Sequence, residues 1–172
     1  MALRPSLWSH PTDNVSLLDL AKTLKIDSVS RLHLSPPLRI SPEQTVGEAV
    51  RLLREEKVGC VLVCEGEKIM GILTERDLLR RVLALGKPLT LPVAECMTPN
   101  PEVVHRKEPI GAAVRRMEEG GYRHLPVVDE AGRLVGVLSV KRIVHYLVEH
   151  FPSTIYNLPP NPGVVQDKRE GA

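Results

Sequence analysis

Thr74 and Asp77 are two side chains whose types and spacing could bind a polar ligand. They follow the apolar run Gly71-Ile72-Leu73, where a predicted strand passes into a predicted helix. Free backbone N–H groups and the positive end of the helix dipole would face an anion bound there, and Asp77 would face the same opening. The same spacing also forms a capping box, with Thr74 at the N-cap and Asp77 at N3, which needs no ligand.

This motif lies in the first copy of an internal repeat. Thr45–Val50 corresponds to Pro109–Val114, and Gly71–Thr74 corresponds to Gly136–Ser139, with one extra turn residue in the second copy. Recurrence of the same segments in the same order indicates two similar structural units. The motif within its duplicated context is therefore much more specific than the four residues alone.

Both copies predict the same elements. Apolar residues recur at i, i+3, i+4 and i+7 in Val46–Leu53 and in Ile110–Met117, which is the spacing of an amphipathic helix. Short apolar runs bounded by glycine or turn residues then predict two hairpins. The predicted strands are Cys60–Cys64, Ile69–Leu73, Leu125–Val128 and Leu134–Val140. A second helix follows each hairpin and buries one apolar stripe. The stripes are Leu78, Leu79, Val82 and Leu83, then Ile143, Val144, Leu147 and Val148.

The predicted strands are apolar on both faces, so one β-α-β-β-α copy alone would expose a large apolar surface. We therefore expect an α/β (α+β) fold in which two repeats, residues 29–92 and 93–151, pack sheet against sheet. Residues 1–28 form an N-terminal extension with a short helix over Val15–Ile26, capped by Asp13 or Asn14. The proline-rich tail, residues 152–172, is expected to be extended, and its Tyr156 and Leu158 to dock elsewhere.

The composition argues against several classes of partner. A formal net charge of +2 over 172 residues gives no sign of a polyanionic partner, and 3% aromatic residues are too few for a base-stacking platform. No apolar run approaches the roughly eighteen residues of a membrane span, and Met1–His10 lacks the apolar core of a signal peptide. We therefore expect a cytoplasmic protein that binds neither nucleic acid nor membrane.

The sequence shows no catalytic apparatus. There is no Walker loop, no Gly-x-Ser-x-Gly elbow and no dinucleotide glycine fingerprint, and Asp77 has no partnered base in its motif. The histidines and cysteines share no metal-ligand spacing. Cys60 and Cys64 lie too far apart along one strand to form a disulfide, so we expect free thiols. These features predict a protein that is not an enzyme and requires no metal or cofactor.

Three segments resemble the tandem cystathionine-β-synthase (CBS) domain pair, also called the Bateman module. They are Gly71–Asp77 (GILTERD), Tyr122–Asp129 (YRHLPVVD) and the linker Cys96–Pro101 (CMTPNP). The resemblance covers roughly Val29 to Phe151. It implies two CBS repeats related by pseudo-twofold symmetry, with a ligand cleft between them.

The resemblance implies a binding role for particular residues. Thr74 and Asp77 match the positions that hold a nucleotide ribose, the carboxylate accepting bonds from the two hydroxyls. Arg123 and His124 match the residues that reach across the cleft to the phosphates, with Arg76 as a third candidate. The alternatives are a solvated surface position for Arg123 and Arg76, and a partly buried strand-edge position for His124.

The adenine is expected against the short strands, where the matching residues are Gly59, Cys60 and Ile40, with Gln44 as a weaker candidate. Gly59 would permit close backbone approach, or it simply ends the preceding helix. In the second copy Ser139 keeps the hydroxyl, but Arg142 stands where Asp77 stands in the first. Arginine cannot accept a hydrogen bond, so one ribose site is predicted rather than two.

The resemblance implies a regulatory module. We expect it to bind an adenine nucleotide of the AMP, ADP or ATP class as a regulatory ligand, to form a homodimer through residues such as Leu79 and Leu147, and to signal to a separate effector protein. The alternative is a structural dimerisation or interaction module without a ligand. Binding of nucleic acid through Arg76, Arg80 and Arg81 is a third possibility that the small net charge disfavours.

Overall fold

Two small sheets organise residues 17–156, the part of the chain that the computed structural model describes. One sheet has the strand order β1-β2-β3-β4 and the other has the order β5-β6-β7. The strands of the first are β1 (Arg39–Ile40), β2 (Cys60–Glu65), β3 (Lys68–Thr74) and β4 (Thr98–Pro99). Those of the second are β5 (Val104–His105), β6 (His124–Val128) and β7 (Leu134–Ser139). The predicted hairpins are therefore β2–β3 and β6–β7, both antiparallel.

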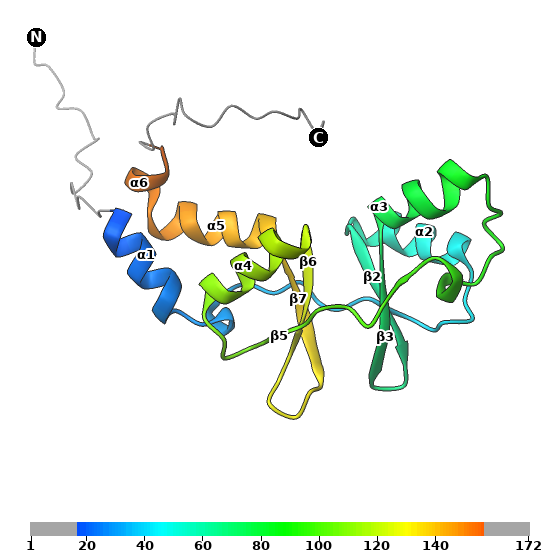
Figure 1. Ribbon diagram of the computed structural model, residues 1–172, viewed down its shortest axis with the longest axis horizontal. Helices are drawn as coiled ribbons and strands as arrows, with labels where there is room; N and C mark the ends of the chain where they lie inside the picture. Colours follow the sequence, from blue (N-terminus) through cyan, green and yellow to red (C-terminus); the bar gives the residue numbers. More distant parts are fainter. Residues whose placement is uncertain (1–16, 157–172) are drawn as a thin grey trace, which may run out of the picture.

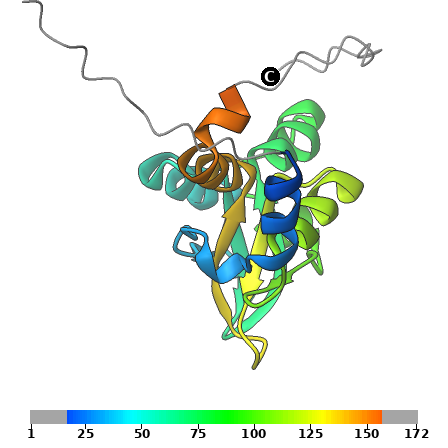
Figure 2. The same cartoon turned by 90° about the vertical axis from the view of Figure 1, so that its left-hand side faces the viewer.

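Helices cover the outer face of each sheet (Figure 1). They are α1 (Leu17–Ile26), α2 (Val46–Glu56), α3 (Glu75–Asp77), α4 (Ile110–Gly120), α5 (Val140–His150) and α6 (Pro152–Tyr156). The shorter turns are Val29–Arg31, Leu78–Val82, Leu83–Leu85 and Val93–Glu95, of which Leu78–Val82 is a π-helix and the others are 3-10 turns. Helix α1, predicted from the sequence, packs against α4 (Figure 2).

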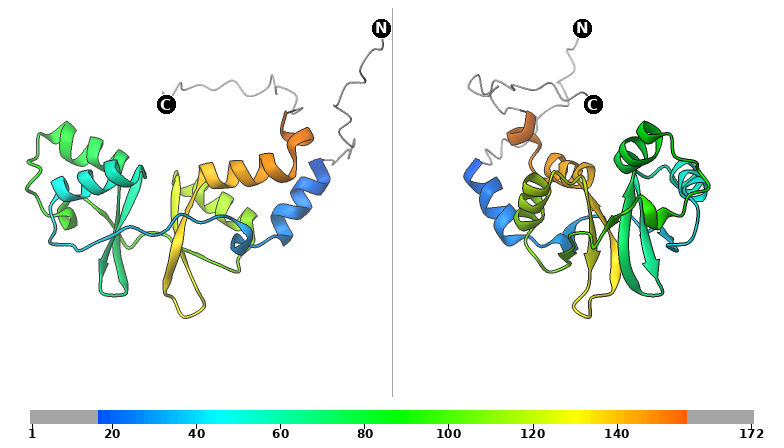
Figure 3. Two further views of the ribbon diagram at one scale, coloured as in Figure 1. Left: turned by 180° about the vertical axis from the view of Figure 1, so that it is seen from behind. Right: turned by 45° about the vertical axis from the view of Figure 1, so that its right-hand side comes forward.

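Alternate residues of the hairpins serve two different cores. Val61, Val63 and Leu73 are fully buried beneath the helices of the first half. Leu62 and Ile72 point the other way and join Val137 of the second half in a separate buried cluster. The two hairpins lie side by side in opposite views of the molecule (Figures 1 and 3). The predicted sheet-against-sheet packing is thus confirmed, and it buries both faces of the strands.

The two halves exchange their opening segments. Val29 and Leu32 open the first repeat in sequence but are buried in the core of the second half. The corresponding Val93 and Cys96 open the second repeat and are buried in the core of the first. Bridges between Ser28 and Pro109 and between Thr45 and Pro92 fix this crossover symmetrically. In space, therefore, the first residues of each sequence repeat belong to the opposite half.

Gly71 and Gly136, equivalent positions in the two hairpins, leave room for the crossing segments. An ideal Cβ at Gly136 would lie 2.8 Å from Cβ of Leu34, and one at Gly71 would lie 3.0 Å from the carbonyl oxygen of Thr98. Both distances are shorter than van der Waals contact. The glycine in each copy of the repeated motif therefore serves backbone packing.

Two predicted elements differ from the structure. The helix after the first hairpin is short and irregular, and Leu79 and Leu83 of its predicted buried stripe are 60% and 66% exposed. Val144 on α5 is also half exposed. The tail does not begin as an extended segment, because Pro152 occupies the first position of helix α6, where proline has no N–H to satisfy. Tyr156 is exposed, and residues 157–172, Asp13 and Asn14 lie outside the described part.

Candidate functional site

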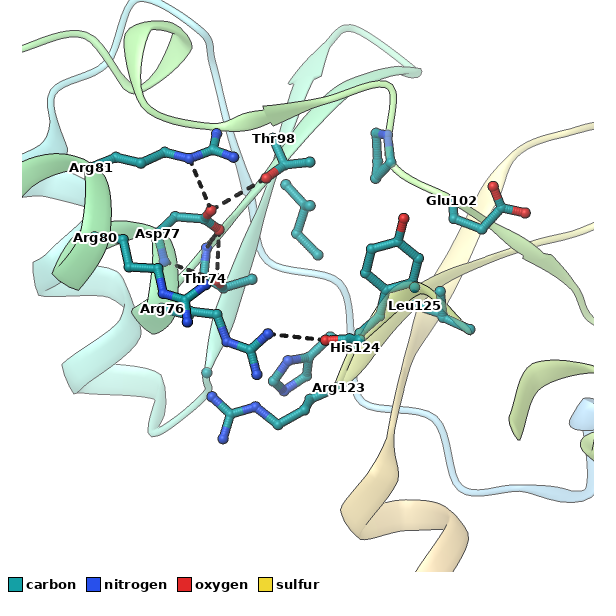
Figure 4. A pocket seen from close by; sticks show the side chains of 16 residues that line it. Thr74, Arg76, Asp77, Arg80, Arg81, Thr98, Glu102, Arg123, His124 and Leu125 are labelled. Atoms are coloured by element: carbon teal, nitrogen blue, oxygen red, sulfur yellow. Dashed lines mark hydrogen bonds and ion pairs between the residues drawn. The ribbon is translucent and has the colours of Figure 1, made fainter. Parts of the chain in front are cut away.

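A cleft of about 230 Å³ opens between the two halves at the end of β3 (Figure 4). We call it the ribose cleft. Thr74, Arg76 and Asp77 reach it from the first half, Thr98 and Glu102 from the linker, and Gly120–Leu125 from the second half. Crossover of the linker is what brings Thr98 to this position, since β4 pairs with β3. Side chains from three separate segments therefore meet in one opening.

Thr74 and Asp77 form the reciprocal capping box at the start of α3. Oδ2 of Asp77 accepts hydrogen bonds from the backbone N–H of Thr74 at 3.0 Å and from its hydroxyl at 2.6 Å. The hydroxyl oxygen in turn accepts the N–H of Asp77 at 3.2 Å. Because one oxygen makes both cap contacts, the other is turned toward the cleft.

Oδ1 of Asp77 makes the longer contacts of the two carboxylate oxygens. It accepts a hydrogen bond from the Thr98 hydroxyl at 3.3 Å and lies 3.5 Å from Nε of Arg81. Arg81 also donates to the carbonyl oxygen of Met97 at 2.6 Å, so it ties the linker to the site. Long contacts of this kind are readily exchanged, and the Asp77 side chain is 13% exposed. The carboxylate is thus oriented but not fully engaged.

Arginines from both halves line the ribose cleft, Arg76 and Arg80 beside Asp77 and Arg123 from the second half. Nη1 of Arg76 donates to the carbonyl oxygen of Gly121 at 3.0 Å, which joins the two halves across the opening (Figure 4). Arg80 and Arg123 line the same space and make no ion pair among the described residues. This arrangement suits an anion, because guanidinium groups bind phosphate oxygens by charge-assisted hydrogen bonds.

His124 lies against Gly59, where the two halves meet. An ideal Cβ at Gly59 would lie 3.0 Å from Cε1 of His124, so only glycine leaves normal space for the ring. Burial lowers the pKa of His124 below its ordinary value, and the charge of Arg123 lowers it further, although Glu75 acts in the opposite direction. The imidazole is therefore neutral at pH 7, and it offers one donor and one acceptor.

Tyr122 is a lining residue that the sequence did not single out for binding. Its ring lies over Gly120, where a side chain of any size would collide with it, and Gly121 ends α4 with φ 64°. Tyr122 is 42% exposed and lines the ribose cleft. Thr98 was likewise noted only as part of the linker. Gly120 and Gly121 were the sequence signal that could have identified Tyr122, since adjacent glycines end the helix and place the aromatic ring directly after it.

A second cleft, of about 590 Å³, lies on the other side of the pseudo-twofold axis. We call it the basic cleft. It is lined by Glu56–Cys60 and Ser139–Arg142, together with Glu75, Arg123 and His124. Ser139 caps α5 by accepting the N–H of Arg142 at 3.4 Å, but no carboxylate completes the box. The expectation of one ribose site stays a prediction that rests on this missing carboxylate.

The structure separates the residues predicted for adenine. Gly59 lines both clefts, and Cys60 lines only the basic cleft. Ile40 lines neither, because β1 turns its side chain into the core of the first half, where it is buried. Gln44 also lies outside both clefts; it accepts the N–H of Ser41 at 3.0 Å at the start of α2. The adenine-binding role of Ile40 and Gln44 stays a prediction that the lining of the two clefts does not support.

Residues 17–156 contain neither a metal-binding cluster nor a membrane-spanning helix. No cluster of three or more histidine, cysteine or acidic side chains in this part of the chain is arranged to hold a metal ion. None of its helices combines the length and apolar character of a membrane span.

Comparison with known proteins identifies the family. The CBS domain model matches residues 29–84 and 93–149. A CBS domain-containing protein of Arabidopsis thaliana, CBSCBSPB3, is 38% identical over 108 residues, which are 62% of this chain and 19% of the relative. The chain thus spans about a fifth of that protein.

Solved structures share the architecture. A CBS domain protein from Pyrobaculum aerophilum complexed with AMP matches with a TM-score of 0.66 and 25% identity, covering 74% of this chain and 99% of that one. The CBS domain pair of protein MJ0100, in complex with 5′-methylthioadenosine and S-adenosyl-L-methionine, gives a TM-score of 0.66 and 25% identity over 73% and 98% of the two chains. The repeated motif, the paired sheets and these matches together establish that the chain belongs to the CBS domain family, as a tandem pair.

Proposed function

We propose that this chain is a regulatory module that binds an adenine nucleotide of the AMP, ADP or ATP class in the ribose cleft and signals to a separate partner protein. The observation that carries the proposal is the carboxylate of Asp77, which uses one oxygen for the helix cap and turns the other toward a cleft lined by arginines. Similar CBS pairs were solved with AMP and with S-adenosyl-L-methionine, which supports an adenosyl ligand.

Each part of such a ligand meets suitable groups. Oδ1 of Asp77 accepts from the ribose hydroxyls when its weaker contacts with Thr98 and Arg81 lengthen. Phosphate oxygens face the guanidinium groups of Arg76 and Arg123. The cleft holds an acceptor for a diol beside donors for an anion, which is the combination that distinguishes a nucleotide from a free sugar or free phosphate.

Binding also provides a route to signalling. Arg76 bonds a carbonyl of the second half, and Arg81 bonds carbonyls of the linker. A ligand that recruits either side chain changes a contact between the halves and so favours one relative arrangement. The effector that reads this arrangement is a separate protein in this proposal.

The test is calorimetric titration of the protein with AMP, using two matched variants. Asp77→Ala removes the charged acceptor, for which we expect binding to weaken by about 10- to 150-fold. Glu48→Ala removes an equivalent capping box, in which Oε2 of Glu48 accepts the N–H of Thr45 at 2.8 Å and its hydroxyl at 2.9 Å, away from either cleft. Both variants lose a cap, but only Asp77→Ala should lose the ligand. Equal affinities in the two variants would contradict the proposal.

A second candidate function is assembly without a ligand. Leu79, Leu83 and Leu85 are each at least 60% exposed beside the irregular helix of the first half, and Val144 is half exposed on α5. These side chains suit a homodimer interface between the helical faces of two copies. Analytical ultracentrifugation of the protein and of Leu79→Glu tests it: a dimer that the substitution dissociates supports the interface, and a monomer at micromolar concentration rejects it.

A further inference from the structure

We infer that a pocket between the crossing segment, residues 29–35, and helix α5 binds a small dianion, a sulfate or phosphate group, with an affinity that rises as the pH falls below neutral. The pocket has a volume of about 210 Å³. We call it the histidine pocket, and its lining residues are Arg31, His33, Arg142, His145, Tyr146, Glu149 and His150. Apart from Arg142, they line neither the ribose cleft nor the basic cleft, so this inference goes beyond the proposed nucleotide site.

Helical spacing on α5 supplies one wall of the histidine pocket. Ile143 and Tyr146 are buried in the core of the second half. Arg142, His145 and Glu149 lie at i, i+3 and i+7, so they share a neighbouring face of the helix, and this face is exposed. The helix that closes the core therefore presents a row of polar side chains to the pocket.

The crossing segment supplies the other wall. Leu32 is buried and has an extended backbone, with φ −82° and ψ 143°, so the side chain of His33 points away from the core. Asp27 holds this wall in place, because its Oδ2 accepts a hydrogen bond from Nη1 of Arg31 at 3.1 Å and another from the hydroxyl of Tyr146. The pocket is thus built from two segments that one carboxylate ties together.

Several polar groups of the pocket are free to bind a ligand. The side chains of His33, Arg142 and His145 make no ion pair or hydrogen bond within residues 17–156. Nδ1 of His150 donates to the carbonyl oxygen of Tyr146 at 2.9 Å, and the two rings stack with their centroids 4.2 Å apart. This bond fixes the imidazole and leaves its Nε2 for a ligand. The pocket therefore offers a guanidinium group and several imidazoles to one anion.

The charge of the pocket depends on its histidines. Arg31 and Arg142 are the cations that line it. While the imidazoles are neutral, the carboxylate bonded to Arg31 and the carboxylate of Glu149 balance these two charges. Burial raises the pKa of Tyr146 to about 12, so its hydroxyl stays uncharged.

Protonation of the histidines converts this balance into an excess of positive charge. Histidine is the side chain that ordinarily changes its charge between about pH 5 and pH 8. Each proton gained in the pocket adds a positive charge and a hydrogen-bond donor, both of which favour a bound dianion. By linkage the bound dianion in turn favours the protonated imidazoles. Binding should therefore strengthen as the pH falls.

The experiment is a titration of the full chain with sodium sulfate near pH 6 and near pH 8, at constant ionic strength, followed through the NMR signals of the histidine rings. Sulfate is a dianion at both values, so a change in affinity belongs to the protein. We expect the signals of His33 and His145 to shift saturably, with an affinity about fivefold or more higher near pH 6.

Matched histidine variants locate the site. His145→Gln removes one imidazole of the pocket and should lower the sulfate affinity near pH 6 by about threefold or more. The control His105→Gln alters an exposed histidine that lines none of the three cavities and should leave the affinity unchanged. Combining His33→Gln with His145→Gln should remove most of the pH dependence.

A parallel titration near pH 7 with glycerol 3-phosphate and with inorganic phosphate identifies the source of the anionic group. Tighter binding of the ester assigns the pocket to a small phosphomonoester, and tighter binding of the inorganic ion assigns it to a free anion. Both results uphold a site for a dianion.

Three results would overturn the inference. Sulfate that shifts only the signals of His124, which lines both clefts, would place the anion elsewhere. Equal affinities near pH 6 and pH 8 would remove the role of the imidazoles. Equal losses in His145→Gln and His105→Gln would show a general effect of charge. The nucleotide proposal is tested separately, by AMP binding and Asp77→Ala.

Discussion

Gly136→Ala tests whether the exchanged segments hold the two halves together. The added Cβ would lie 2.8 Å from Cβ of Leu34, 3.1 Å from its Cδ1 and 3.3 Å from the carbonyl oxygen of Ser35. Cβ of Leu34 is fixed to the backbone, so rotation of the side chain cannot relieve the closest contact. The crossing segment must therefore shift away from β7.

That shift weakens two backbone hydrogen bonds. The N–H of Ser35 donates to the carbonyl oxygen of Val137 at 3.0 Å, and the N–H of Val137 donates back at 2.9 Å. Overpacking costs about 1–3 kcal/mol and each weakened bond costs up to about 1 kcal/mol. Reduced entropy of the unfolded chain offsets about 0.4–1 kcal/mol. We expect a net loss of about 1–3 kcal/mol in the free energy of unfolding.

Urea denaturation measures this loss, with Gly47→Ala as the matched control. An ideal Cβ at Gly47 meets its nearest atom, the carbonyl oxygen of Leu89, at 3.4 Å, which is ordinary contact. Because Gly47 lies within α2, alanine there should leave stability unchanged or raise it by up to about 1 kcal/mol. A Gly136→Ala protein as stable as the parent would refute the claim that the crossing segment is tightly packed against β7.

Three further outcomes follow from the pKa shifts. Burial lowers the pKa of His124, so as the pH falls the unfolded chain binds a proton at this histidine before the folded chain does. The free energy of unfolding should therefore fall by up to about 1.4 kcal/mol per pH unit below pH 6.5. Urea unfolding measures this slope, which should be smaller in His124→Gln. Burial raises the pKa of Cys60 to about 12, and all three thiols are buried, so a maleimide at pH 8 should label none until urea is added. The Tyr146 hydroxyl donates a hydrogen bond to Asp27, and burial raises the pKa of Tyr146 to about 12. Tyr146→Phe should lower the free energy of unfolding by about 1–2 kcal/mol, as measured by thermal unfolding. Unchanged stability would show that this hydrogen bond contributes nothing.

The packing of the two sheets could be predicted because neighbouring residues along a single strand already indicate that both of its faces are buried. Val61 and Leu62 are both apolar neighbours on one strand, so both faces of that strand needed a partner. The capping box at Thr74 and Asp77 was likewise readable from four residues, and the structure forms it. The loss of a carboxylate at Arg142 was visible in the same way.

Features that depend on distant segments could not be predicted. Val29 and Val93 have the same local chemistry, and nothing in either segment says which core it enters. Leu79 has the spacing of a buried helical residue, but spacing alone does not distinguish a stripe that faces the chain's own core from one that faces outward. Thr98 joins the site only because the linker crosses to β3.

The two clefts begin at equivalent capped helix starts, and the residue three positions after each cap gives them different chemistry. Thr74 and Ser139 cap equivalent helices, and the bridges that hold the crossing segments are paired across the axis. Asp77 confers an acceptor on one side, and Arg142 confers a cation on the other. Because the crossover couples the halves through shared cores, a ligand that bonds both sides stabilises one arrangement of the whole pair, whereas a ligand confined to either side biases it less.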